Sequence, residues 1–169
     1  MKYQEINGDL IELSRKGKFD IIAHGCNCFN TQTKGIALSM AKTFHTDTFT
    51  LENKFLQGDI RKLGSIDAEE FQVSSMSIVP KEFTGPTTSE LKYDLTVINC
   101  YTQFRYGKGL QLDYEALTLC LRKINHIYKG LTIGLPKIGA GLAGGDWNKI
   151  KTIIQTELKD MSSVIIVCK

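Results

Sequence analysis

Short apolar segments rich in β-branched residues alternate along this chain with stretches in which apolar residues recur at helical spacing. Parallel strands need a crossover connection, usually a helix, so this alternation predicts an α/β fold. We therefore expect a three-layer α/β/α sandwich around a mixed, mostly parallel sheet of about six strands. The clearest strand-like segments are Lys2–Ile6, Phe19–Ala23, Asp94–Thr102, Leu131–Leu135 and Val164–Cys168.

Three stretches carry apolar residues along one helical face. The first helix is expected to begin near Gly35, after which apolar residues follow at intervals of three and four. A second helix is expected over Tyr114–Tyr128, with Asp113 placed to cap its first turn. A third is expected over Trp147–Leu158, where Asp146 is an equally good cap.

The middle of the chain gives the weakest signal. Lys54–Gln57 and Gln72–Val79 are interpreted as strands on either side of a polar connector. The segment Lys81–Lys92 is interpreted as a hairpin tip or loop, because it contains Gly85-Pro86 and several threonines.

Length and cysteine usage favour a single domain. The chain has 169 residues and no repeat or Pro/Ser-rich linker. At this size roughly 70% of the extended-chain surface is buried on folding, so a core forms without disulfides or metal. The five cysteines are scattered, and the three histidines lack metal-ligand spacing. We expect one domain over residues 1–169, with reduced thiols, no metal site and no cofactor.

Charge and hydropathy exclude several classes of protein. The 21 basic and 18 acidic residues nearly balance and only four of the basic ones are arginine, which argues against a dedicated nucleic-acid surface. No apolar run approaches the ~18 residues that a membrane span needs. The opening Met1–Lys18 is too charged for a secretory signal, so a cytoplasmic location without a membrane partner is expected. A small anionic ligand held by backbone amides remains compatible with this balance.

The strongest functional signal is the glycine-rich segment Leu135–Trp147, which reads LPKIGAGLAGGDW between a buried strand and an amphipathic helix. Glycine permits positive φ and lets the backbone approach a ligand closely. A row of N–H groups leading into a helix N-terminus suits a diphosphate. The pattern matches neither a Walker loop nor the dinucleotide fingerprint. The alternative interpretation is a flexible connection between strand and helix.

The second signal, His24–Cys28 (HGCNC), ends the second predicted strand. His24 can titrate near neutral pH, and the amide of Asn27 both donates and accepts hydrogen bonds. A hydrogen-bonded structural histidine is an equally good interpretation of His24. The thiols of Cys26 and Cys28 have no neighbouring base in the sequence, so a cysteine nucleophile has little support.

The third signal, Asn7–Leu10 (NGDL), directly follows the first predicted strand. An acidic side chain there can accept a hydrogen bond from an exocyclic amine such as that of adenine. Alternatively, Asp9 caps a short helix running to about Leu13, and the motif taken alone favours this cap.

In combination, these motifs and the GIAL helix start at Gly35 resemble a macro domain over essentially the whole chain. This is the fold that binds ADP-ribose, also described as the ADP-ribose 1″-phosphate processing module. The glycine-rich loop is most similar to the small-hydrolase branch with terminal ADP-ribose–protein glycohydrolase and the yeast ADP-ribose 1″-phosphate phosphatase. The HGCNC stretch is similar to that of the phosphatase.

The resemblance implies a contact for each part of ADP-ribose. Asp9 would hold the adenine amine, with the amide of Leu10 beside it, and Asn27 would contact the distal ribose. The diphosphate would be wrapped by Gly35, Ile36 and Ala37 at the start of a helix, and by Ile138, Gly139, Ala140, Gly141 and Leu142 in the glycine-rich loop.

The sequence also departs from the glycohydrolase pattern. Gly35 follows Thr33-Lys34 instead of a run of glycines. The strand that carries a lysine nucleophile in that enzyme reads Cys100–Gln103 here, and the acid after its loop is replaced by Ala143. These departures put the lysine-dependent route in doubt.

We therefore expect ADP-ribose binding and hydrolysis of an ADP-ribose derivative at the distal ribose. The reaction would be removal of phosphate from ADP-ribose 1″-phosphate or release of ADP-ribose from a modified macromolecule. His24 and Asp146 are the candidate catalytic groups, with Asn27 as the orienting residue. The alternative is a non-catalytic module that reads ADP-ribose.

Overall fold

A seven-stranded mixed sheet forms the centre of the computed structural model, which describes residues 1–49, 57–83 and 91–169. Its strand order is β1-β7-β6-β2-β5-β3-β4. The first five strands in this order run parallel, whereas β3 is antiparallel to β5 and β4 is antiparallel to β3. The strands are β1 (Lys2–Asn7), β2 (Ile21–Asn27), β3 (Ile66–Val73), β4 (Ile78–Pro80), β5 (Tyr93–Gln103), β6 (Thr132–Leu135) and β7 (Ser163–Cys168).

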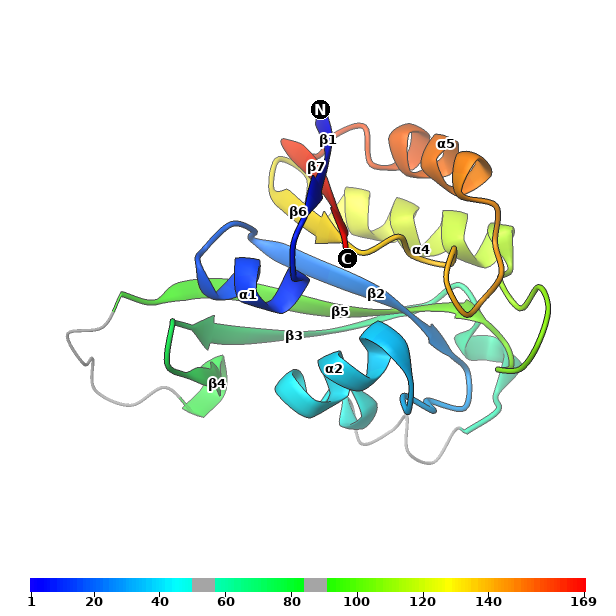
Figure 1. Ribbon diagram of the computed structural model, residues 1–169, viewed down its shortest axis with the longest axis horizontal. Coiled ribbons are helices and arrows are strands. Elements are labelled where there is room, and N and C mark those ends of the chain that lie inside the picture. The colour runs from blue at the N-terminus through cyan, green and yellow to red at the C-terminus, as the bar shows by residue number, and fades with distance from the viewer. Residues whose placement is uncertain (50–56, 84–90) are drawn as a thin grey trace.

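Helices cover both faces of this sheet (Figure 1). On one side lie α1 (Leu10–Arg15) and α2 (Gly35–Phe44), and on the other lie α4 (Tyr114–Ile127) and α5 (Trp147–Glu157). Three short 3-10 turns complete the described elements: η1 (Thr46–Thr48), η2 (Ile60–Lys62) and η3 (Lys81–Phe83). The predicted three-layer α/β/α sandwich is therefore confirmed, with one strand more than expected. None of the described helices is long and apolar enough to cross a membrane.

Strand β2 shows how the core is divided between the two helical layers. Ile21 and Ala23 belong to the buried cluster beneath α4 and α5, whereas Ile22 belongs to the cluster beneath α1 and α2. Successive side chains of a strand point to opposite faces, so both faces of this central strand are apolar and buried.

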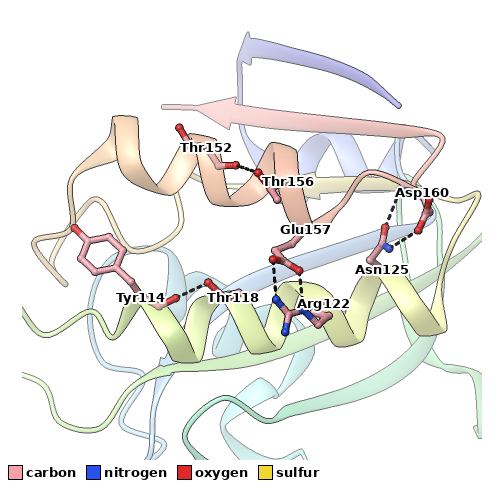
Figure 2. Close-up of polar contacts among 8 residues, drawn as sticks. All are labelled: Tyr114, Thr118, Arg122, Asn125, Thr152, Thr156, Glu157 and Asp160. Atoms are coloured by element: carbon pink, nitrogen blue, oxygen red, sulfur yellow. Dashed lines mark hydrogen bonds and ion pairs between the residues drawn. The ribbon is translucent and has the colours of Figure 1, made fainter.

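The layer of α4 and α5 is held by apolar packing and by polar contacts at its outer side (Figure 2). Arg122 donates two hydrogen bonds, of 2.9 and 3.0 Å, to the carboxylate of Glu157. The amide nitrogen of Asn125 donates to the carboxylate of Asp160, and its amide oxygen accepts from the backbone N–H of Asp160. An exposed pair such as Arg122–Glu157 contributes about 1 kcal/mol or less, so the buried apolar faces dominate this packing. The layer fixes the start of α5, directly after the glycine-rich loop.

The caps predicted for the last two helices are present. Asp113 accepts a hydrogen bond from the N–H of Ala116 at 2.9 Å, and Asp146 accepts one from Asn148 at 2.8 Å. The helix predicted near Gly35 begins at that residue, yet no side chain caps its first turn.

The middle of the chain differs most from the prediction. The region taken as a polar connector contains β3, and the predicted strand Gln72–Val79 is instead the end of β3, a turn, and β4. β3 lies next to the sheet edge and is only partly covered, so its acidic residues remain partly exposed and its sequence looks polar. Of the predicted strand Lys54–Gln57, only Gln57 is described, and it lies in a turn. Within Lys81–Lys92, η3 precedes residues 84–90, which lie outside the described residues.

Candidate functional site

A cleft runs along the carboxyl ends of the parallel strands. It consists of two adjoining cavities of about 480 and 600 Å³, which share Gly35, Ile36, Pro136 and Lys137 in their walls. Volumes of this size are typical of small-ligand sites, and ligands of open α/β sheets bind at this end of the strands. The cleft is where the sequence motifs predicted it, between the start of α2 and the glycine-rich loop.

One wall of the cleft is the N-terminus of α2. The first intrahelical bond runs from Leu38 to Lys34 at 3.3 Å, so the N–H groups of the three preceding residues have no partner within the helix. No side chain caps them. Gly35 itself has φ +57°, a conformation that glycine adopts without the strain a Cβ would bring. This helix start therefore presents uncapped donors to the cleft, as anion sites at helix N-termini do.

The opposite wall is the glycine-rich loop. The N–H groups of Gly141 and Leu142 donate to no acceptor among the described residues. Gly139 has φ +76°, and a Cβ there would lie 2.8 Å from the side chain of Leu112. Its carbonyl accepts the N–H of Gly145 at 2.8 Å, which closes the loop into a fixed turn. The loop is thus structured, and the interpretation as a flexible connection is not supported.

Four lysines add positive charge to the cleft. Lys34 and Lys108 line the larger cavity, Lys169 lines the smaller one, and Lys137 lines both. The ammonium of Lys137 lies 5.5 Å from the ring centre of Trp147. Together with the free N–H groups, these lysines make the centre of the cleft suitable for a small anion.

The smaller cavity is bordered by Asp9, whose carboxylate has two structural partners. One oxygen caps α1 by accepting from Ile11 at 2.9 Å and Glu12 at 3.1 Å. The other accepts from Lys169 at 2.8 Å, and this contact lowers the pKa of Asp9 below its usual range. The capping interpretation is therefore confirmed. A contact with adenine stays a prediction, as does the role of the neighbouring Leu10 amide.

Asn27 lines the larger cavity and organises the loop that follows β2. Its amide oxygen accepts from the N–H groups of Phe29 and Thr31 at 3.0 and 3.1 Å, and its amide nitrogen donates to the Thr31 carbonyl at 2.9 Å. An asparagine amide offers two acceptor and two donor positions, so one N–H remains available to a ligand.

His24 lies on the face of β2 that α1 and α2 cover, as Ile22 does, and is not among the described residues that line the cleft. It is fully buried, and its Nε2 lies 2.7 Å from Oδ1 of Asn99. Asn99 in turn donates to the carbonyl of Thr46, next to the end of α2. Burial lowers the pKa of His24 to about 4, so the ring is neutral at pH 7. This environment favours the structural interpretation of His24.

Asp146 is also not among the described residues that line the cleft. Its carboxylate caps α5, and its own N–H donates to the hydroxyl of Tyr114 at 2.8 Å. The three predicted catalytic residues are therefore not brought together, because only Asn27 borders the cleft. The buried thiol of Cys28 has its pKa raised to about 11 by burial, so it is protonated at neutral pH.

The sequence analysis did not assign several residues that border the larger cavity. They come from the loops after β2 and β5 and from the end of β5 itself: Thr31, Thr33, Thr102, Gln103, Tyr106 and Gly107. The stretch FRYGKGL follows a predicted strand at its carboxyl end and carries two glycines and two basic residues. This composition was the sequence signal that could have assigned the loop after β5 to the site. Among the described residues, no group of three or more His, Cys, Asp or Glu side chains is placed to hold a metal ion.

Comparison with known proteins shows one similar sequence and several similar structures. No protein-family model matches the sequence. An uncharacterized 17.5 kDa protein of Enterobacteria phage T4, from the tk-vs intergenic region, is 34% identical over 168 residues, which cover 95% of this chain and 93% of the phage protein.

The similar structures include macrodomains. DarTG of Thermosipho africanus in complex with ADP-ribose has a TM-score of 0.69 at 16% identity, over all of this chain and 42% of that one. A macrodomain protein of Streptomyces coelicolor has a TM-score of 0.64 at 21% identity, over 99% of both chains. The macrodomain of Thermus aquaticus DarG has a TM-score of 0.63 at 19% identity, over 99% and 97%.

Proposed function

We propose that this chain, which belongs to one family with the phage T4 protein and has the macro-domain fold, binds ADP-ribose in the cleft between α2 and the glycine-rich loop. The observation that carries this proposal is the pair of facing donor groups. Unpaired N–H groups of Gly35–Ala37 and of Gly141-Leu142 border the same cavity. Two rows of amides on opposite sides suit a diphosphate, whose oxygens spread its charge in both directions.

The two cavities then divide the ligand between them. Adenine would lie in the smaller cavity beside Asp9, and the distal ribose in the larger one beside Asn27. The shared residues between the cavities would hold the diphosphate. The ADP-ribose complex of the structurally similar Thermosipho protein supports this ligand class.

Calorimetry tests the binding proposal. We expect the native chain to bind ADP-ribose with the same heat and affinity in the presence and absence of a chelator, because none of the proposed contacts involves a metal ion. Lys159→Ala serves as a surface control, because Lys159 is exposed and lies beyond α5. This variant should bind ADP-ribose like the native chain. Absence of a binding heat at millimolar ADP-ribose would contradict the proposal.

We propose hydrolysis of an ADP-ribose derivative as the second candidate function. The remaining N–H of Asn27 supports it, because a donor at the distal-ribose end can orient a water or a leaving group. Asp9 is the only acidic side chain among the described residues that line the cleft, and it lies at the adenine end. A reaction would therefore depend on an oriented water more than on a protein base, and a non-catalytic reader stays the alternative.

Turnover separates these two candidates. The chain is incubated with ADP-ribose 1″-phosphate and, separately, with an ADP-ribosylated protein, and released phosphate or ADP-ribose is followed. Release from either substrate that is lost in Asn27→Ala would support hydrolysis. Tight ADP-ribose binding without release from either substrate would identify a reader of ADP-ribosylated macromolecules.

A further inference from the structure

Thr102 occupies an irregular position at the carboxyl end of β5. The parallel pairing of β2 with β5 joins Cys26 to Tyr101 and then Asn27 to Gln103. Thr102 is therefore an extra residue on β5 with no partner in the β2 register. Bulges of this kind re-aim a side chain, and they are frequent beside active sites.

The side chain of Thr102 has no partner although its backbone is held. Its carbonyl accepts the N–H of Asp113 at 2.9 Å. Its hydroxyl oxygen is the only buried side-chain nitrogen or oxygen without a hydrogen-bond partner among the residues at 1–49, 57–83 and 91–169. Folded proteins leave few buried polar groups unpaired, and each such group calls for an explanation.

Gly25 provides the space in front of this hydroxyl. A Cβ at Gly25 would lie 2.9 Å from Oγ1 of Thr102 and 3.4 Å from the side chain of Ile138. The backbone of Gly25 has no positive φ, so its conformation does not require glycine. The missing side chain is therefore a matter of space, and both Gly25 and Thr102 line the larger cavity.

We propose that the Thr102 hydroxyl hydrogen-bonds the bound ligand, and that Gly25 keeps the path to it open. This inference rests on the proposed function and assigns a part of the ligand. The shared centre of the cleft is suited to the diphosphate, and Asp9 borders the opposite end. The group that meets Thr102 is accordingly a sugar hydroxyl of the distal ribose. Because a threonine hydroxyl both donates and accepts, it matches such a group in either direction.

The test compares two ligands on three variants of the full chain. Thr102→Val replaces the hydroxyl by a methyl of the same shape, Thr102→Ser keeps the hydroxyl, and Thr118→Val makes the same change at a hydroxyl on α4 that is paired with Tyr114 and lies outside the cleft. Each is titrated calorimetrically with ADP-ribose and with ADP, which lacks the distal ribose. We expect Thr102→Val to bind ADP-ribose about tenfold more weakly, corresponding to about 1.4 kcal/mol. Binding of ADP should be unchanged, Thr102→Ser should stay within about twofold of the native chain, and Thr118→Val should bind both ligands normally.

Three outcomes decide against the inference. Unchanged affinity of Thr102→Val for ADP-ribose, or an equal loss for ADP-ribose and ADP, would contradict it while leaving the proposed function intact. A lower melting temperature of ligand-free Thr102→Val would also contradict it, because removal of an unpaired hydroxyl should leave this temperature equal or higher. No binding of ADP-ribose by the native chain would instead overturn the proposed function, and this inference with it.

Discussion

Two polar clusters lie near the carboxyl end of β2, one buried in the core and one in the cleft. In the core, His24, Asn99 and Thr46 form a buried chain of hydrogen bonds, with distances of 2.7 Å from the ring to Asn99 and from Asn99 to the Thr46 carbonyl. In the cleft, the Thr102 hydroxyl and the first N–H groups of α2 have no protein partner. The buried cluster has the residue types of an active site, but the cleft has the unused hydrogen-bonding capacity.

In this protein, polar groups without a protein partner indicate the site better than reactive residue types do. A buried polar network that is fully paired rigidifies the core, and its members have nothing left to offer a ligand. The N–H groups that border the cleft have no protein partner and remain free to bind a ligand in place of water, and the buried Thr102 hydroxyl is unpaired as well.

The largest effect is expected from Asn99→Ala, which breaks the buried cluster. This change leaves Nε2 of His24 with only the weak contact to the Cys26 thiol at 3.7 Å and removes the Asn99 donor from the carbonyl of Thr46, which should lower the free energy of unfolding by about 2–4 kcal/mol. Urea unfolding measures the loss. The matched control is Asn125→Ala on α4, which breaks two hydrogen bonds in a less buried place and should cost less.

ADP-ribose affinity is the second readout for this variant. Below its unfolding transition, Asn99→Ala should bind like the native chain, because Asn99 is buried and is not among the described residues that line the cleft. A loss of affinity in folded protein would show that the two clusters are coupled and would contradict the comparison.

The next effect concerns pH and His24. Its pKa is about 4 in the folded chain and about 6.5 when unfolded, so the unfolded chain binds the proton between these values. Stability contributed by the neutral ring is therefore complete above pH 6.5 and is lost as the pH falls toward 4. Between pH 6.5 and 5 the loss should be about 2 kcal/mol.

Urea unfolding of the native chain and of His24→Gln at several pH values isolates this effect, since the other titrating groups are common to both. The native chain should lose more stability on acidification than the variant. Identical pH profiles would show that the buried ring does not titrate as described. If His24 were instead catalytic, His24→Gln would lose turnover by ~10²-fold or more with little change in affinity.

A smaller effect is expected from Asp9→Asn, which separates the two roles of this residue. Asparagine caps a helix about as well as aspartate, so the melting temperature should change little. If the carboxylate also receives the adenine amine, ADP-ribose affinity should fall by about tenfold, as for a charge-assisted hydrogen bond.

Two results would decide against an adenine contact of Asp9. Native affinity in Asp9→Asn would show that the residue is only a cap. A loss of affinity of the same size in Lys169→Ala would point to the ion pair with Lys169, rather than the carboxylate itself, as the determinant.

The sequence predicted most of the fold because the parallel strands are strongly apolar and the helices carry clear stripes. It missed β3, since the acidic residues of Ile66–Val73 look like a connector when their partly exposed position beside the sheet edge is unknown. It also predicted where the cleft lies, because the glycine-rich loop and the start at Gly35 are local signals. The sequence left open whether His24 is structural or catalytic. Both faces of β2 are buried, so the alternation of side chains along this strand does not reveal which face His24 takes.

Thr102 illustrates what the sequence does not contain. Its unpaired hydroxyl results from the register shift between β2 and β5 and from the absence of a side chain at Gly25, which lies 77 positions earlier in the chain. No local pattern encodes such a pairing. The caps at Asp9 and Asp146 are a different case, because the local sequence predicted both a cap and a chemical role for each residue, and the structure shows the caps.

Amide NMR of the ¹⁵N-labelled chain during titration with ADP-ribose tests the central claim most directly. The amide signals of Gly35–Ala37 and of Gly141-Leu142 should shift progressively and saturate together, while those of His24 and Asn99 should change little. Saturating shifts centred on His24 and Asn99, or no shifts at millimolar ADP-ribose, would contradict the assignment of the cleft as the ligand site.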